Sequence, residues 1–291
     1  MNNGLYISAV VLLLLSACGG GEKKKKTLTR NPHPQTVSSD SGKIKNDSVF
    51  SDSLTGTKPE IQTVQQYKSA GGVIVDVIHA NPTGSSIEYG SVVKINYKGY
   101  LPDGKPFDSN ELIGMPLPFF VGVGMSVKGW DEALPLIKAG EKARIKVPSK
   151  LAYGKKGYGK LIPPDTDLTF DMEIVEKMKP KITASGLEFY KTLEKKGTSP
   201  NDSSMVTIHY YGWVKGGKLF DSSHMNGKPY TFHMSSGRAI KGWKECLKMM
   251  SPGEKAFVVV PSSLGYGETG IPELVPANAT LIYSLELLEV K

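Results

Sequence analysis

Apolar and polar residues alternate along three stretches of the chain. Residues 92–98 read VVKINYK, residues 142–148 read KARIKVP and residues 167–175 read DLTFDMEIV. Every second residue is apolar, which is the period of a β-strand with one face on a core and the other in water. The pattern therefore predicts three strands of an antiparallel sheet.

The same pattern returns 113 residues later. A Gly-Lys turn followed by Phe-Asp-Ser lies at 104–109 and again at 217–222. A period this long fits a domain, because solenoid units repeat every ~20–50 residues. We predict two copies of one domain, 61–178 and 183–291, each with its own core and joined by a short, partly flexible linker. The apolar strand positions expected in the second copy are Ile208, Tyr210, Phe257, Val259, Leu281, Tyr283, Leu285 and Leu287.

One short amphipathic segment lies between the strands of each copy. In GWKECLKMM, at 242–250, Trp243, Cys246, Leu247 and Met250 fall at helical spacing. The corresponding GWDEALPLI carries Pro135, which should shorten or kink the helix because proline cannot donate an interior hydrogen bond. One helix against an antiparallel sheet predicts an α+β fold for each domain.

The N-terminus is apolar from Ile7 to Leu15 and ends in Leu-Ser-Ala-Cys at 15–18. This length suits a signal peptide and is too short to span a bilayer. The motif resembles the bacterial lipobox, which implies a signal peptide over 1–17 and lipidation of Cys18. An ordinary secretory signal or an apolar N-terminal helix is the alternative. With Cys18 lipidated, Cys246 has no partner for an intrachain disulfide.

Residues 18–60 form the predicted link between lipid and domains. They are rich in Gly, Ser, Thr, Asn and Lys, so they bury too little apolar surface to offset their ordering entropy. Lys23 to Lys26 supply half of the net charge of +8 in one run. That run can contact anionic headgroups or simply be solvated. Because the basic residues do not cluster among aromatics in the repeats, we expect no nucleic-acid partner.

Long segments of both copies are similar to the FKBP-type peptidyl-prolyl cis-trans isomerases, the macrolide-binding immunophilins. The second copy carries GGKLFDSS at 216–223, AIKGWKECLKMMSPGEKAFVVVPSSLGYG at 239–267 and VPANATLIYSLELL at 275–288. The first carries NYKGYLPDGKPFDS at 96–109, SVKGWDEALPLIKAGEKARIKVPSKLAYG at 126–154 and LIPPDTDLTFDMEI at 161–174. The resemblance covers about 68–177 and 185–291, and implies a twisted sheet curled around the helix with a pocket between them.

The resemblance assigns the pocket residues by position. The implied catalytic residues are Tyr97, Phe107, Asp108, Trp130, Tyr153 and Phe170, with Tyr210, Phe220, Asp221, Trp243, Tyr266 and Tyr283 in the second copy. The implied substrate-binding residues are Leu117, Phe119, Val127, Tyr158 and Ile162, with Tyr230, Phe232, Ile240, Ile271 and Val275. Departures from the family pattern, such as Leu117 at a rim position and Tyr158 and Ile271 in place of a flap histidine, bear on substrate preference.

This assignment implies a peptidyl-prolyl isomerase that acts on proline-containing polypeptides, with macrolides of the FKBP type as potential inhibitors. No cofactor is expected, and the five histidines show no metal-ligand spacing. A non-catalytic proline-binding chaperone or scaffold is the alternative. Aromatics on strands are also ordinary core residues, and Asp108 and Asp221 can be turn residues. We expect a lipid-anchored protein of the cell envelope that assists folding of exported proteins. An outer-membrane site facing the periplasm is preferred because Gly19 stands where aspartate would resemble an inner-membrane retention signal, with the cytoplasmic membrane and the cell surface as alternatives.

Overall fold

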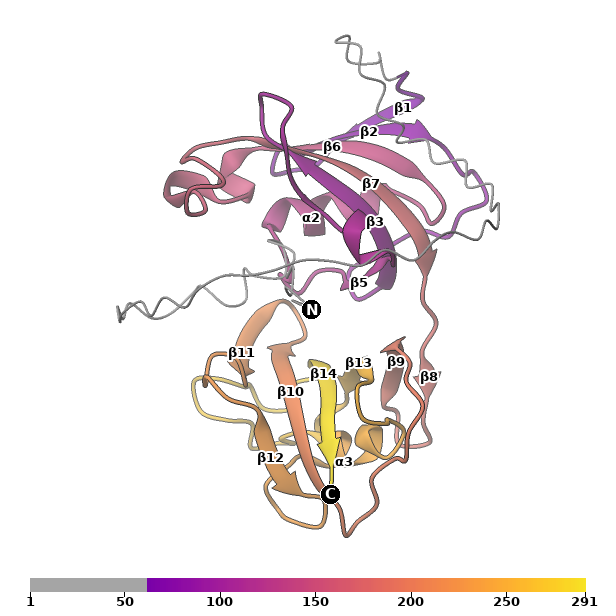
Figure 1. Cartoon of the computed structure of the whole chain (residues 1–291), viewed down its shortest axis with the longest axis vertical. Coiled ribbons are helices and arrows are strands. Elements are labelled where there is room, and N and C mark those ends of the chain that lie inside the picture. The colour runs from indigo at the N-terminus through magenta and orange to yellow at the C-terminus, as the bar shows by residue number, and fades with distance from the viewer. Residues whose placement is uncertain (1–61) are drawn as a thin grey trace, which may run out of the picture. The chain divides into compact units, whose positions relative to one another are not determined.

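The computed structural model describes residues 62–291. The first repeat forms a seven-stranded antiparallel sheet in the order β1-β2-β6-β7-β3-β4, with β5 also paired to β3 (Figure 1). Its elements are β1 Gln65–Lys68, β2 Ile74–His79, β3 Val92–Tyr100, β4 Pro106–Ser109, β5 Leu117–Phe120, α2 Lys128–Ala133, β6 Lys142–Val147 and β7 Leu168–Lys177. Short 3-10 turns lie at Glu111–Ile113, Leu134–Leu136, Ser149–Leu151 and Gly154–Lys156.

The second repeat has the same topology. Its sheet runs β11-β10-β14-β13-β9-β8, with β12 paired to β10. The elements are β8 Lys181–Ile182, β9 Glu188–Leu193, β10 Met205–Val214, β11 Lys218–Ser222, β12 Tyr230–His233, α3 Lys241–Leu247, β13 Lys255–Val260 and β14 Leu281–Val290, with a 3-10 turn at Ser262–Leu264. The predicted α+β fold of two tandem domains is confirmed.

The three stretches with period two are strands, as predicted. Val93, Ile95 and Ile145 are fully buried on the inner face of the first sheet, against α2 and its neighbours. Lys94 and Lys146 lie on the opposite, outer face, which explains why these strands alternate so regularly.

One expectation for the second repeat is wrong. Phe257 and Val259 do not belong to the core beneath β13, whose core-facing residues are Ala256, Val258 and Val260. In the sequence KAFVVV both strand faces are apolar, so alternation could not tell the inner face from the outer one.

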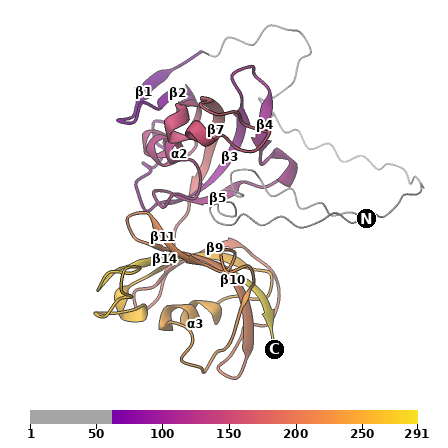
Figure 2. The same cartoon turned by 90° about the vertical axis from the view of Figure 1, so that its left-hand side faces the viewer.

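Each short helix lies along the inner face of its sheet, as Figure 2 shows for α3. Trp243, Cys246, Leu247 and Met250 are all buried, as expected from their helical spacing, although α3 itself ends at Leu247. In the first domain α2 ends at Ala133 and Pro135 lies in the following 3-10 turn, so proline shortens the helix as predicted.

Glycine is required where each helix meets its sheet. A Cβ at Gly129 would lie 2.3 Å from Val147 Cγ1, and one at Gly242 would lie 2.5 Å from Val260 Cγ1. These glycines let the helix approach β6 or β13 closely and bring the next residue, Trp130 or Trp243, over the sheet.

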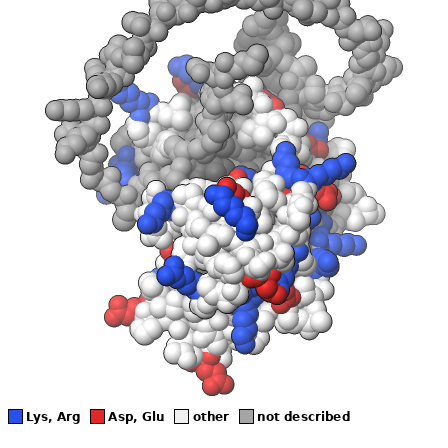
Figure 3. Space-filling view, turned by 60° about the horizontal axis from the view of Figure 1, so that its bottom comes forward, with Lys and Arg blue, Asp and Glu red and all other residues white. Residues whose placement is uncertain are grey.

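The predicted signal peptide, lipidated Cys18 and tether lie outside the described residues. Within residues 62–291, no helix is long and apolar enough to cross a membrane. On the face drawn in Figure 3, basic and acidic side chains are interspersed over the second domain rather than gathered by sign.

Candidate functional site

Aromatic rings gather around Trp130 in the first domain. The Trp130 ring centroid lies 4.9 Å from that of Tyr97, 5.5 Å from Phe119 and 5.3 Å from Phe170. Phe107 on β4 extends the group, with its centroid 5.6 Å from Phe170. Edge-on ring pairs at these distances are favourable beyond the apolar area that they bury. The helix thus supplies the centre of an aromatic cluster whose other members come from four strands.

The second domain builds the same cluster around Trp243. Its ring centroid lies 4.7 Å from Tyr210, 5.1 Å from Tyr283, 6.2 Å from Tyr230 and 6.3 Å from Phe232. Phe220 completes the group, 6.0 Å from Tyr283 and 6.4 Å from Tyr266. The structure therefore brings the predicted aromatic residues together in both domains.

A tyrosine and an aspartate are joined in each cluster. The hydroxyl of Tyr97 donates to Asp108 Oδ2 at 3.0 Å, and that of Tyr210 donates to Asp221 Oδ2 at 2.6 Å. The other carboxylate oxygen of each aspartate accepts the backbone N–H of the following residue. Asn226 also donates to Asp221 Oδ1 at 3.2 Å. These bonds fix both carboxylates within the clusters, whereas in the Gly-Lys bend of the first domain it is Asp103 that accepts the backbone N–H of Lys105.

The hydroxyl of Tyr153 is buried and has no hydrogen-bond partner among the described residues. Burial raises the pKa of Tyr153 well above its usual range, and the nearby charge of Asp108 raises it further. Tyr153 therefore keeps its proton at neutral pH and can act as a donor. Burial likewise raises the pKa of Tyr266. A buried donor without an acceptor is costly, so a ligand carbonyl placed there would recover that cost.

The predicted substrate-binding residues lie around the clusters. Phe119 and Phe232 are in the ring contacts above, and Leu117 and Tyr230 begin β5 and β12. Val127 and Ile240 immediately precede α2 and α3. In the loop before the last strand of each domain, an isolated β-bridge joins Tyr158 to Ile162 or Ile271 to Val275. Where the first domain has the aliphatic Leu117, the second has the phenol ring of Tyr230, whose hydroxyl donates to the Arg238 carbonyl at 3.0 Å.

Two glycines in the cluster walls were given no role from the sequence. A Cβ at Gly99 would lie 2.7 Å from the Phe107 ring, and one at Gly212 would lie 2.7 Å from the Tyr283 ring. A larger residue would push these rings out of place. In the sequence, each glycine lies two residues after the cluster tyrosine of its strand, Tyr97 or Tyr210, and the two glycines are 113 residues apart.

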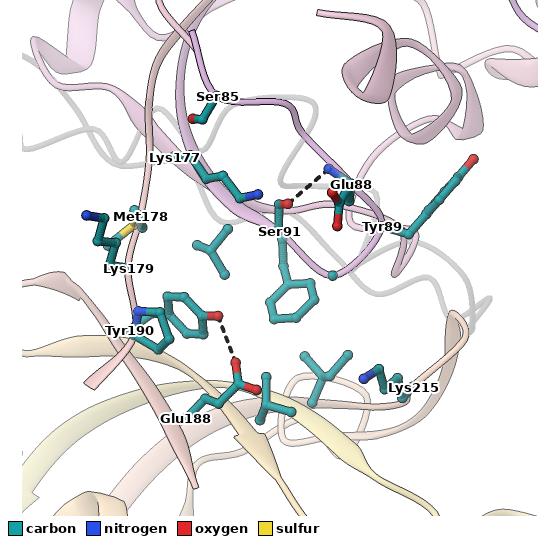
Figure 4. A pocket seen from close by; sticks show the side chains of 16 residues that line it. Ser85, Glu88, Tyr89, Ser91, Lys177, Met178, Lys179, Glu188, Tyr190 and Lys215 are labelled. Atoms are coloured by element: carbon teal, nitrogen blue, oxygen red, sulfur yellow. Dashed lines mark hydrogen bonds between the residues drawn. The ribbon is translucent and has the colours of Figure 1, made fainter. Parts of the chain in front are cut away.

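A cavity of about 540 Å³ lies away from the aromatic clusters (Figure 4). It lies beside the linker residues Met178, Lys179 and Pro180. Among residues 62–291, no three His, Cys, Asp or Glu side chains lie close enough together to hold a metal ion.

Comparison with known proteins agrees with this geometry. The family model described as FKBP-type peptidyl-prolyl cis-trans isomerase matches residues 84–175 and 196–288. The chain is 33% identical over 229 residues to the peptidyl-prolyl cis-trans isomerase FKBP10 of Bos taurus, which covers 76% of this chain and 39% of that protein. It is 35% identical over 206 residues to FKBP9 of Homo sapiens, covering 69% and 35%.

A bacterial relative is also similar over part of the chain. The FKBP-type isomerase FkpA of Buchnera aphidicola is 36% identical over 152 residues, covering 50% of this chain and 59% of that protein. The crystal structure of FkpA from Escherichia coli shares 38% identity, with a TM-score of 0.37, over 38% of this chain and 51% of that chain.

The chain spans less than two-fifths of the length of FKBP10 and FKBP9. Two family matches at the two repeats nevertheless cover more than half of its own length. The chain belongs to the FKBP-type peptidyl-prolyl cis-trans isomerases, with two domains of that family in tandem.

Proposed function

We propose that each domain catalyses the cis-trans isomerisation of Xaa-Pro bonds in polypeptides. The observation that carries the proposal is the aromatic cluster around each tryptophan, combined in the first domain with the buried, unpartnered hydroxyl of Tyr153. An apolar site of this kind accepts a proline ring, and one donor beside it fixes the direction of the adjoining carbonyl.

The reaction needs no covalent intermediate. The amide barrier of about 18–20 kcal/mol comes from lost resonance when the C–N bond twists. The planar amide is more charge-separated than the twisted one, so water stabilises the planar form more. An apolar cluster withholds that solvation and therefore favours the twisted state relative to water.

The clustered residues have distinct roles in this mechanism. Trp130 supports the proline ring, with Tyr97, Phe119 and Phe170 as walls. Tyr153 donates to the carbonyl that precedes the proline. Asp108, fixed by the Tyr97 hydroxyl, orients neighbouring polar groups. Lowering the barrier by about 4–7 kcal/mol would accelerate the reaction about 10³–10⁵-fold.

We further propose that the clients are exported proteins that fold near a membrane. Slow proline isomerisation can limit folding there, since it takes ~10–100 s without a catalyst. The motif ending in Cys18 supports a lipid anchor in the cell envelope, preferably on the outer membrane facing the periplasm. The aromatic clusters also make macrolides of the FKBP type candidate inhibitors.

Isomerisation of a fluorogenic Xaa-Pro peptide by the full chain tests the proposal. Asp108→Val and Asp221→Val should each leave about half of the activity if the two domains are equal, and the double variant should approach the uncatalysed rate. Circular dichroism confirms that each variant is folded. Full activity in a folded double variant would refute the assigned site, and an inactive wild type that binds the peptide would favour the non-catalytic binding module.

A further inference from the structure

The outer faces of the two sheets differ in chemistry. In the first domain, Arg144 on β6 forms two hydrogen bonds with Asp171 on β7, at 2.6 and 2.7 Å. Beside it, Lys146 contacts Asp76 on β2 at 3.0 Å. The outer face of this sheet is thus covered by a network of charged side chains.

The second domain has apolar residues in the same register. In the strand register of the first sheet, Arg144 lies opposite Asp171 on one side and Asp76 on the other. The equivalent residue of the second sheet, Phe257, lies opposite Ser284 and Tyr190. Lys146 is replaced by Val259, whose cross-strand partner is Ile282. Trp213 on β10 lies next to Ile282. We call Tyr190, Trp213, Phe257, Val259 and Ile282 the β13 patch.

The first domain has a smaller apolar patch of its own. Val92 on β3 is paired with Phe120 on β5, and Val123 follows three residues later. None of the three belongs to the core cluster around Trp130. The second repeat has Met205, His233 and Ser236 at the equivalent positions, so this patch is mostly polar there. We call Val92, Phe120 and Val123 the β5 patch.

Both patches are buried although neither lies in the core of its own domain. Phe120 and Val123 are 1% and 2% exposed, and Trp213 and Phe257 are 1% and 4% exposed. Residues 62–291 all belong to a single compact unit. An apolar surface that is kept from water without belonging to a domain core is the signature of a docking surface.

Each patch has a residue joined to the linker or to the strand that follows it. The backbone N–H of Met178 donates to the carbonyl of Val92, at 2.8 Å. After β7 ends at Lys177, only three residues precede β8 at Lys181, and β8 pairs with β9, which carries Tyr190. Figure 4 shows Tyr190 beside Glu188, to which its hydroxyl donates at 2.8 Å. A short tether raises the effective concentration of one domain near the other to the order of millimolar.

We propose that the β13 patch binds the β5 patch of the same chain, so that the two domains act as one rigid body. Each patch is apolar in one repeat and largely polar or charged in the other, which is what a contact between unlike surfaces of two similar domains requires. The proposal replaces the expectation of a partly flexible linker, and it is independent of catalysis. Its consequence for function is that two proline sites are held at a fixed separation along a client.

The test moves residues of the first repeat into the second. Phe257→Arg with Val259→Lys restores the charges of Arg144 and Lys146 in the full chain. The domains should then tumble separately, so ¹⁵N relaxation should give each a shorter rotational correlation time, and small-angle scattering should give a larger maximum dimension. Thr207→Lys is the matched control, because it copies Lys94 to a site on the same sheet outside the patch. The control should behave as wild type.

A reciprocal variant covers the case in which the first one misfolds. Phe120→His with Val123→Ser copies His233 and Ser236 into the first domain and should separate the domains in the same way. Unchanged tumbling in both folded variants would overturn the proposal. So would a wild type whose domains already tumble independently. Sedimentation that reveals a wild-type dimer lost in these variants would assign the patches to a second copy instead.

Discussion

The Tyr153 hydroxyl is a buried donor without a partner among the described residues, so its removal isolates one interaction. Tyr153→Phe should lower kcat/KM by a few-fold to roughly tenfold, as expected for about 0.5–1.5 kcal/mol from one hydrogen bond made to substrate. Folding stability should not fall, since no protein hydrogen bond is lost.

This effect is measured in an Asp221→Val background, so that the second domain does not mask it. Tyr100→Phe, on the outer face of β3, is the control and should leave kcat/KM unchanged. Equal activities of the Tyr153→Phe variant and its parent would remove Tyr153 from the mechanism.

Buried tyrosines also make stability depend on alkaline pH. Burial raises the pKa of Tyr283 and Tyr210 far above the value of about 10 that tyrosine has in an unfolded chain. The unfolded state therefore loses these protons first, so the stability they contribute is complete below pH 10 and is lost above it. Each such group should cost about 1.4 kcal/mol per pH unit above 10.

Urea unfolding at pH 8, 10 and 11 checks this dependence. Tyr283→Phe, which copies Phe170 of the first domain, should reduce the slope above pH 10. A free energy of unfolding that is the same at pH 8 and pH 11 would contradict the assigned burial.

Most residues of the candidate site could be predicted because the motif resemblance fixes them by position. The resemblance could not predict which of these residues are hydrogen-bonded to each other. The Tyr97–Asp108 hydrogen bond joins β3 to β4, and the register of two strands cannot be read from a single motif. Gly99 and Gly212 were not assigned to the site because a glycine offers no functional group, and only their position two residues after the cluster tyrosine marks them.

At the scale of elements, the Arg144–Asp171 pair should dominate the outer face of the first sheet. The Asp171 side chain is only 5% exposed, so Arg144→Met leaves a nearly buried carboxylate without its partner. This change should cost about 3 kcal/mol of unfolding free energy. The combined change Arg144→Phe and Asp171→Ser, which copies the second repeat, should cost clearly less because no charge is left behind.

Urea unfolding of these full-chain variants gives both values. If the single and combined variants lose the same free energy, the cost comes from packing and not from an unpaired charge.

Strands were predicted with the correct inner face where the other face is polar, and with the wrong inner face where both faces are apolar. Residues 92–98 alternate cleanly because their outer side chains are lysine and asparagine. The inner face of β13 was assigned wrongly because KAFVVV is apolar on both faces, whereas β2 and β9, which read IVDVIH and EFYKTL, were not identified although each carries polar residues. The ambiguity has a physical cause, since the outer face of β13 is itself apolar.

At the scale of the whole molecule, the proposed lipid anchor at Cys18 rests on the sequence alone. Cys18→Ser should abolish incorporation of radiolabelled fatty acid and release the protein from the membrane fraction. Cys246 is fully buried on α3, so Cys246→Ser is the matched control and should retain the label. A wild type that never incorporates label would refute the lipid anchor.

The two-domain organisation followed directly from the offset of 113 residues, because both copies keep the same spacing from turn to helix to last strand. The docking of one copy on the other could not be predicted that way. It depends on residues where the two copies differ, whereas a repeat is recognised from the residues that they share.

The central claim is that both aromatic clusters bind and isomerise an Xaa-Pro bond, and the three tryptophans of the chain allow one NMR measurement to test it. Trp130 and Trp243 have indole N–H groups without partners among the described residues, whereas Trp213 lies in the β13 patch. With an Xaa-Pro peptide added, the indole signals of Trp130 and Trp243 should shift, that of Trp213 should not, and exchange between the cis and trans peptide signals should accelerate. Accelerated exchange without a shift at Trp130 or Trp243, or shifts at both without accelerated exchange, would contradict the account.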